Sequence, residues 1–377
     1  MIQATTRSLL RGAAALATTA FATVALQAQT DTVGTLTVTG YADAYYGAFG
    51  GGEYGGGELV EFFTMSSRNN TFGLNAAGVA ASYEGNRVRG TAELFFGEVQ
   101  ETAWGEDNYI KNANAGFEIA PGWWVDAGFF STYVGVESAL PKDNVFSSVA
   151  VSTFQEPYFH SGVKTSWEGT ENLTLELWLM NRFAGYDENN DAKTLGLVAR
   201  YTLAEGYDLS YTGTFGRETD GRLGDDEDGQ LTLYNNVNLL AAPSDQFEFI
   251  INASLATVTN SSGDGGDEAT IGSNGMVTAR YFVSDEFAIA ARGSFVTGDL
   301  YGYGTVDGEI ASNITDFGLS LQLIPTPNTY VRLEGRTIGA ETEIFGNPNL
   351  GDLSDRRFDL VVSTGVSLDR AFNFMKR

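Results

Sequence analysis

Apolar and polar residues alternate with a period of two along most of this chain. In the segment 246–258, one face is apolar and consists of Phe247, Phe249, Ile251, Ala253 and Leu255. The opposite face carries Gln246, Glu248, Asn252 and Ser254, interrupted by Ile250, and the segments 173–180 and 357–368 repeat the pattern. Because successive side chains of a strand point to opposite faces, each segment predicts a β-strand with one apolar and one polar face.

The alternating segments have the length of a strand that crosses a bilayer at a tilt, which is about 9–11 residues or slightly more. We expect about sixteen strands, an even number, at 34–48, 71–83, 87–98, 109–119, 123–134, 157–167, 173–183, 193–203, 208–218, 230–241, 246–258, 271–283, 287–297, 310–324, 328–338 and 357–368.

The connections between these segments alternate between short and long. The short ones are 84–86, 120–122, 168–172, 204–207, 242–245, 284–286 and 325–327. The long ones are 49–70, 99–108, 135–156, 184–192, 219–229, 259–270, 298–309 and 339–356. Barrels of bacterial outer membranes have short periplasmic turns and longer extracellular loops. The sequence therefore predicts an all-β fold: a transmembrane, antiparallel, up-and-down β-barrel with its short turns in the periplasm and its long loops outside.

Aromatic residues flank the short connections, where an interfacial girdle is expected. They are Trp123, Trp124, Trp167, Tyr201, Tyr207, Phe247, Phe287 and Tyr330.

The first 28 residues have the pattern of a secretory signal peptide. Arg7 and Arg11 precede a small, apolar run at 12–26 that is too short to span a bilayer, and Ala28 offers a cleavage point. We therefore expect residues 1–28 to be a signal peptide and 29–377 to be a single β-barrel domain in the outer membrane of a Gram-negative cell.

Composition and charge remove several classes of function. The chain has 46 glycines, no cysteine and one histidine, and 48 acidic residues against 22 basic ones give a net charge of −26. Without cysteine there is no disulfide framework, thiol nucleophile or Cys-ligated metal. A strongly acidic protein repels phosphate backbones, so nucleic acid is a poor partner. We expect no cofactor and no metal.

Four stretches resemble the OmpL-like β-barrel porins of Gram-negative outer membranes. They are GYADAYYGAF at 40–49, FGLNAAGVAASYEGNRVRGTAELFFGE at 72–98, WVDAGFFSTYVGVESALPKDN at 124–144 and PYFHSGVKTSWEG at 157–169. The resemblance covers the first third to half of the mature chain. It implies an outer-membrane pore and says little about the solute.

If the apolar faces contact lipid, the opposite faces line the lumen, since a charge facing lipid at mid-depth costs about 2–4 kcal/mol. This assignment predicts twelve pore-lining residues: Arg87, Arg89, Glu93, Lys164, Arg182, Arg200, Arg280, Arg292, Asp316, Arg332, Glu334 and Arg336. The basic residues are thus concentrated inside a strongly acidic protein.

The connection 135–156 is one of the two longest, and resemblance to general porins suggests that it folds inward and narrows the channel. Its charged members are Glu137, Lys142 and Asp143. If it packs against the basic wall, separated charges would produce a transverse field that selects solutes. The acidic clusters at 225–228 and 264–268 are interpreted as a solvated outer surface, with cation binding as the alternative.

The reading favoured by the sequence is a porin through which small hydrophilic solutes or ions diffuse passively. Its partners would be outer-membrane lipids and those solutes, and either a homotrimer or a monomer remains open. One alternative is a barrel that anchors surface loops without an open pore. Another is an outer-membrane hydrolase, which is disfavoured because the only histidine, His160, is adjacent to Ser161 and so points to the opposite face.

Overall fold

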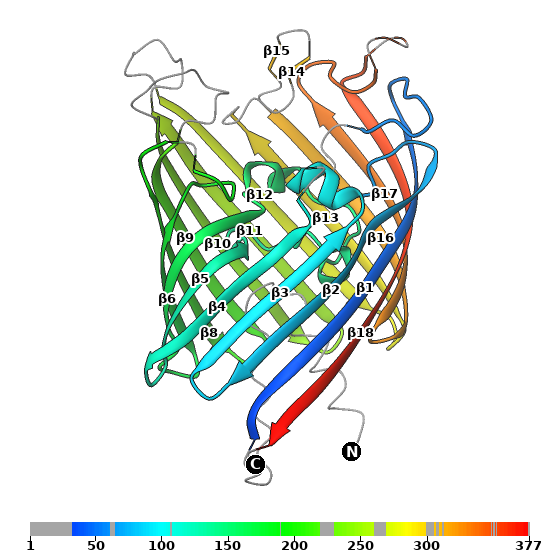
Figure 1. Cartoon of the computed structure of the whole chain (residues 1–377). Helices are drawn as coiled ribbons and strands as arrows, with labels where there is room; N and C mark the ends of the chain where they lie inside the picture. The colour runs from blue at the N-terminus through cyan, green and yellow to red at the C-terminus, as the bar shows by residue number, and fades with distance from the viewer. Residues whose placement is uncertain are drawn as a thin grey trace.

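The chain forms one closed β-barrel in the computed structural model (Figure 1), which describes residues 32–375 apart from 61–64, 106–107, 189, 219–229, 260–268, 299–304, 307–308, 311–312, 348, 350 and 352. The barrel strands are β1 (Thr32–Gly50), β2 (Thr71–Gly85), β3 (Val88–Phe96), β4 (Ile110–Ala120), β5 (Trp123–Ser131), β6 (Phe159–Trp167), β7 (Leu173–Met180), β8 (Thr194–Ala204), β9 (Tyr207–Glu218), β10 (Gln230–Ser244), β11 (Phe247–Thr259), β12 (Ala269–Phe282), β13 (Phe287–Thr297), β16 (Asn313–Thr326), β17 (Thr329–Ala340) and β18 (Arg356–Met375). The predicted fold class and strand number are confirmed.

Every barrel strand pairs antiparallel with its neighbours along the chain, and β1 pairs with β18 to close the sheet. This last pairing runs from Thr32 opposite Met375 to Gly50 opposite Phe358. A closed barrel leaves no unpaired edge, which matters in lipid because the hydrocarbon offers no hydrogen-bond partners. In the described part of the chain, no helix is long and apolar enough to cross a membrane.

The two ends of the barrel differ in the length of their connections, as the sequence predicted. Only Asn86 and Arg87 separate β2 from β3, whereas residues 341–355 separate β17 from β18. The short turns and the C-terminus lie at one end in Figure 1, and the long loops lie at the other end or inside. Two differences from the prediction are a small sheet of β14 (Thr305–Val306) and β15 (Glu309–Ile310), and the extension of β18 beyond residue 368.

Strand β16 shows how the two faces of the barrel differ. Phe317, Leu319 and Leu321 point outward and are 45–51% exposed. The residues between them, such as Asp316 and Ser320, are buried on the inner face. The apolar positions therefore face the lipid, and the polar positions gather inside the barrel.

The connection 132–158 between β5 and β6 lies inside the barrel (Figure 1). It contains two short 3-10 helices, η2 (Pro141–Asp143) and η3 (Val151–Gln155). Its residues bond to inward side chains of widely separated strands: Tyr133 to Thr214 of β9, and the Lys142 N–H to Tyr41 of β1. The connection therefore crosses the lumen.

Two other long connections pack onto this inner loop. The connection between β3 and β4 contains a short π-helix, η1 (Gln100–Trp104), and its Trp104 joins a cluster with Leu140 and Val149. Phe345, from the connection before β18, packs with Val151 in a second cluster. The inner loop therefore packs against two other connections as well as against the wall.

The outward apolar face leads to a first prediction. Leu319→Arg places a charge near the middle of β16 and should lower the free energy of unfolding by about 2–4 kcal/mol. Leu323→Arg, closer to the periplasmic end of the same strand, should cost less, because the penalty falls toward the interface. Urea-induced unfolding in lipid vesicles measures both. Equal penalties at the two positions would contradict the membrane placement of this strand.

Candidate functional site: the barrel interior

The inner face of the barrel outside β1 and β2 divides into three sectors with different chemistry. We call the inner faces of β3–β8 the ion-pair sector, those of β9–β12 the amide sector, and those of β13, β16, β17 and β18 the arginine sector. All three are assembled from alternate residues of neighbouring strands, so their composition follows from the period-two pattern.

The ion-pair sector holds cations and carboxylates in contact. Arg89 bonds Asp126 at 2.6 Å and Glu168 at 3.0 Å, and its guanidinium lies over the ring of Trp124. The side chain of Arg89 is 24% exposed. Charge in this sector is thus neutralised locally and still reachable from the lumen.

Further up the same wall, one buried carboxylate holds two cations. Glu176 bonds Arg200 at 2.7 Å and lies 3.5 Å from the Lys164 ammonium, and it also accepts the indole N–H of Trp178. The side chains of Arg200 and Lys164 are 19% and 11% exposed. Near the top, Lys111 bonds Glu93 at 3.1 Å.

In the amide sector, the described inward side chains that are buried carry no charge. Asn252 donates to Asn238 at 2.8 Å, and Asn238 donates to Asn236 at 2.7 Å, so the amides form a ladder across β10 and β11. The ladder also binds the inner loop, because Asn252 donates to Glu156 and Asn236 accepts the Gly135 N–H.

The arginine sector contains buried guanidinium groups and carboxylates in one network. Arg336 lies 2.9 Å from Asp316, and Arg357 bonds Asp359 at 2.7 Å. Arg292 lies farther from Asp316, at 3.6 Å. The side chains of these three arginines are at most 2% exposed.

The backbone of the inner loop completes the hydrogen bonding of this sector. Arg332 donates to the carbonyl oxygens of Pro141 and Asn144 at 2.8 and 2.7 Å, and Arg336 donates to that of Val149. In return, Glu334 accepts the backbone N–H groups of Ser147 and Ser148. We call residues 141–153 of the loop the strap. It contains η2 and the start of η3, and wall side chains pair several of its backbone groups, as buried backbone groups require.

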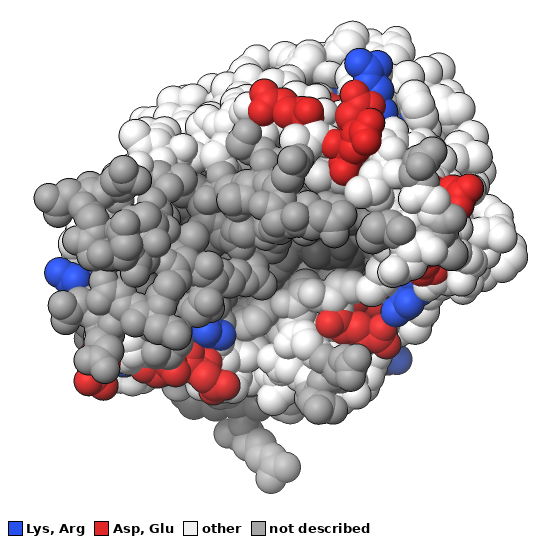
Figure 2. Space-filling model, turned by 90° about the horizontal axis from the view of Figure 1, so that it is seen from above, with Lys and Arg blue, Asp and Glu red and all other residues white. Residues whose placement is uncertain are grey.

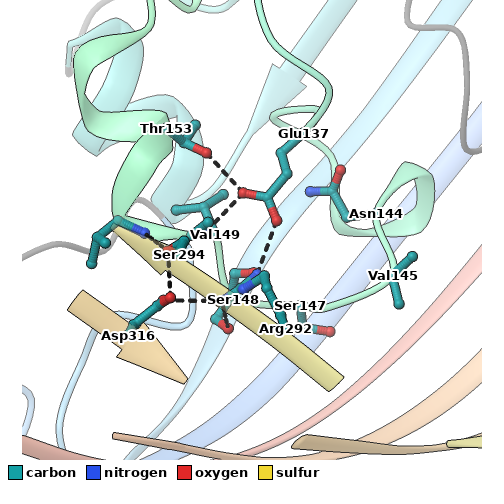
Figure 3. A network of polar contacts seen from close by, with 12 residues as sticks. Glu137, Asn144, Val145, Ser147, Ser148, Val149, Thr153, Arg292, Ser294 and Asp316 are labelled. Atoms are coloured by element: carbon teal, nitrogen blue, oxygen red, sulfur yellow. Dashed lines mark hydrogen bonds and ion pairs between the residues drawn. The ribbon is translucent and has the colours of Figure 1, made fainter. Parts of the chain in front are cut away.

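Glu137 is the loop carboxylate that reaches Arg292 (Figure 3). One of its oxygens accepts from the Arg292 guanidinium at 2.9 Å. The other accepts the Ala150 N–H at 2.7 Å and the Thr153 hydroxyl at 2.8 Å. The carboxylate therefore bridges the wall and the strap.

The structure places ten of the twelve predicted pore-lining residues on the inner face, namely Arg89, Glu93, Lys164, Arg200, Arg280, Arg292, Asp316, Arg332, Glu334 and Arg336. The other two lie in connections between strands: the prediction is wrong for Arg87, whereas for Arg182 it stays a prediction. Arg87 lies in the β2–β3 turn with φ of 66°, its side chain is 61% exposed, and it bonds the Glu118 carbonyl at the rim. Arg182 follows the end of β7, in the connection to β8.

The three charged residues predicted for the constriction lie on the inner loop, and they have different ion-pair partners. Glu137 is bound to the arginine sector, whereas Lys142 and Asp143 pair with each other at 2.6 Å. A transverse field needs separated charges, and here Glu137 and Arg292 are in direct contact. The hypothesis of such a field between this loop and the basic wall is therefore wrong at this pair.

The comparisons with known proteins agree on the class of protein. The family model described as "Putative beta-barrel porin-2, OmpL-like" matches residues 35–368. The chain belongs to this porin family. No curated protein matches it in sequence.

Several solved structures of outer-membrane proteins have a similar fold. The anion-selective porin from Comamonas acidovorans superposes with a TM-score of 0.62 at 9% identity, over 89% of this chain and 100% of that one. The trimer form of in-vitro folded OmpT from Vibrio cholerae gives 0.60 at 12% identity, over 89% and 100%. The DcaP channel of Acinetobacter baumannii gives 0.57 at 12% identity, over 89% and 97%. At these identities the similarity concerns the fold, and it agrees with an outer-membrane barrel.

His160 and Ser161 point to different partners, as their adjacency predicted. His160 is buried inside, bonded to Thr132 and stacked on Tyr133. The Ser161 hydroxyl donates to the Tyr186 carbonyl. The pair therefore forms no Ser-His dyad.

Two of the aromatic residues predicted for the girdle face inward instead. Trp124 lies beneath Arg89, and Tyr330 is buried and donates its hydroxyl to Asp43. Trp123, Tyr201 and Phe247 do point outward and are 42–46% exposed. An aromatic residue near a turn can face either the lipid or the lumen. Which face it occupies depends on its place in the alternation of the strand and not on its being aromatic.

The prediction missed functional residues of two kinds. Arg357 shares the inward parity of Asp359, so the same alternation could have found it. The asparagine ladder and the bonds between the strap backbone and the wall arginines have no sequence motif, and only the folded contacts reveal them. The acidic clusters at 225–228 and 264–268 and the signal peptide lie outside the described residues.

Glu156 lies in the inner loop three residues after the strap, and its carboxyl is buried among groups that disfavour its negative charge. Burial raises the pKa of its carboxyl to about 8, the negative charge of Glu137 adds to the rise, and the hydrogen bond from Asn252 opposes it. Gly135 lies directly against this carboxylate at φ 81°, where an added Cβ would collide with it. Tyr234 is the other titratable group nearby.

This environment predicts a pH-dependent attachment of the loop. A group whose pKa is raised in the folded state stabilises that state at low pH, and the contribution is lost as the pH rises through about 8. The thermal unfolding midpoint should therefore fall between about pH 5 and pH 8 and level off above that range. Glu156→Gln keeps a neutral side chain and should flatten this dependence. The idea fails if both proteins lose stability equally over this range.

The arginine–carbonyl contacts predict a second effect. Arg332→Ala leaves the Pro141 and Asn144 carbonyls unpaired, at a cost of about 1–3 kcal/mol for each buried group. The strap should detach more often, so trypsin should cleave the folded protein after Lys142 about tenfold faster or more. Arg280→Ala is the matched control, because Arg280 pairs with Glu248 and not with the loop. Equal cleavage rates in the two variants would show that Arg332 does not hold the strap.

Proposed function

We propose that this porin allows small hydrophilic solutes and ions to diffuse passively across the outer membrane. One observation carries the proposal: a closed sixteen-stranded barrel has an apolar outer face and an inner face lined by charged and amide side chains. Barrels of sixteen to eighteen strands are wide enough for an aqueous channel. Diffusion through it requires neither a cofactor nor a chemical step.

The exposure of the inner charges supports a path along the ion-pair sector. Arg89 and Arg200 remain 24% and 19% exposed, whereas Arg292 and Arg357 are fully covered. Seen from the end with the long loops, the surface is hollowed inside the rim, and acidic groups lie on the described part of that rim (Figure 2). Solutes would pass between the ion-pair sector and the inner loop, with Lys142 and Asp143 on the loop side.

The surroundings of the channel are part of the proposal. Residues 1–28 would be removed as a signal peptide, which leaves one barrel domain in contact with outer-membrane lipids. A homotrimer is the assembly we favour, because one of the similar structures is a trimer form.

A barrel that anchors surface loops without conducting is the second candidate, and one observation favours it. Inward side chains at mid-depth, among them Trp178, Ser320 and Arg292, are at most 1% exposed beneath the loop and its neighbours. If the loop covers the interior at this depth completely, the barrel would conduct only when the loop moves.

Conductance in a planar bilayer separates these candidates. The refolded protein, shown to be folded by its heat-dependent mobility on a gel, should give stepwise openings.

In a salt gradient, Arg89→Gln should shift the reversal potential toward cation selectivity, because Asp126 and Glu168 lose their shared partner. Arg87→Gln removes the same charge from the exposed turn and should shift it much less. A folded barrel that never conducts would leave only the anchor.

A further inference from the structure

The contacts of Glu137 describe a complete binding site for a carboxylate. Its two oxygens receive a guanidinium N–H from Arg292, a backbone N–H from Ala150 and a hydroxyl from Thr153, at 2.7–2.9 Å (Figure 3). Charge-assisted hydrogen bonds of this kind are the strong ones, and a guanidinium fits a planar carboxylate well. We call these three donors the cradle.

Arg292 depends on Glu137 more than on the carboxylate of the wall. Asp316 lies 3.6 Å from Arg292 but 2.9 Å from Arg336, and its other oxygen accepts the Ser294 hydroxyl. Without Glu137, the Arg292 guanidinium would lose its shortest ion pair inside a buried site, which is a strongly unfavourable state. The cradle therefore attracts any small anion that can reach it.

The cradle is also incompletely used. Among the described residues, the Nε atom of Arg292 is buried and has no hydrogen-bond partner. The Arg292 residue as a whole is 1% exposed. Buried donors without acceptors are uncommon in folded proteins. They indicate capacity for more acceptor oxygens than Glu137 supplies.

The Glu137 side chain and the groups that form the cradle are held by different contacts. The main chain beside Glu137 is tied to the strap at Ser138, which exchanges two hydrogen bonds with Asn144, whereas the Glu137 side chain is 8% exposed and bonds only the cradle. The strap is held by Glu334, Arg332 and Arg336, none of which bonds Glu137. Glu137 can therefore leave while Ala150 and Thr153 stay in place.

We propose that the cradle of Arg292, Ala150 and Thr153 binds small carboxylate anions, and that Glu137 occupies it as a tethered competitor. As a step in solute passage this rests on the proposed channel function, but as a binding site it does not. A tethered carboxylate acts at an effective concentration in the millimolar range or above. Free carboxylates should therefore bind weakly to the wild type and more tightly once Glu137 is removed.

Propionate is the natural probe, because it reproduces the Glu137 side chain beyond its Cα. Calorimetric titration of the refolded protein should give a Kd for propionate at least about tenfold lower in Glu137→Ala than in the wild type. Propionamide should not bind, because its NH2 group meets three donors. Asp143→Ala is the matched control: it removes a charge from the same loop without emptying the cradle, and it should leave the propionate Kd unchanged.

Variants of the cradle test its membership. Adding Arg292→Gln to Glu137→Ala should abolish propionate binding. If that double variant does not fold, Glu137→Ala with Thr153→Val removes one donor and keeps all wall charges, and it should weaken binding several-fold. The proposal is overturned if Glu137→Ala binds propionate no more tightly than the wild type, or if Asp143→Ala gains as much.

Bilayer recordings separate this site from the channel function. Propionate added to a conducting Glu137→Ala pore should reduce the chloride current over the concentration range in which calorimetry detects binding. A protein that binds propionate but never conducts keeps the site and loses the channel. One that conducts but shows no calorimetric binding keeps the channel and loses the site.

Discussion

The structure depends on one constraint: every backbone amide and carbonyl group in the hydrocarbon core must find its hydrogen-bond partner within the protein. Hydrocarbon cannot pair an amide or a carbonyl group, so the sheet must close, and the pairing of β1 with β18 closes it. A closed sheet gives every strand one face toward lipid and one face inside. Charged side chains of the mid-strand regions then lie at the inner positions, and the sectors of the interior are the result.

The concentration of charge inside creates a second requirement that the strands alone do not meet. Arg292, Arg332 and Arg336 have more donors than the carboxylates beside them accept, and desolvated cations need close acceptors. The loop 132–158 supplies these acceptors from its main chain and from Glu137. Loop and wall are thus complementary. The loop can lie inside the barrel because wall side chains pair backbone groups that its two short 3-10 helices leave free.

Most of the fold could be predicted from local pattern because strand formation here is a local matter. Period-two alternation and connection length identify all sixteen strands, and parity places Arg89 and Arg292 inside. Parity fails at the ends of strands: Arg87 lies in a two-residue turn, and Arg182 follows the last paired residue of β7. The site depends on contacts between residues far apart in sequence, such as Glu137 with Arg292, and no local pattern encodes which carbonyl meets which arginine.

The division of labour between barrel and loop suggests where this porin can change its selectivity. Strand pairing and the lipid-facing side chains stabilise the barrel, and neither involves the inner loop. Within the loop, the strap is bound at many points, whereas residues 135–138 are held by Gly135, Glu137 and the two hydrogen bonds between Ser138 and Asn144. Substitutions in this short arm would change side chains of the barrel interior without disturbing the sheet. If the barrel conducts as proposed, the charge of the passage would therefore depend on the loop as well as on the strands.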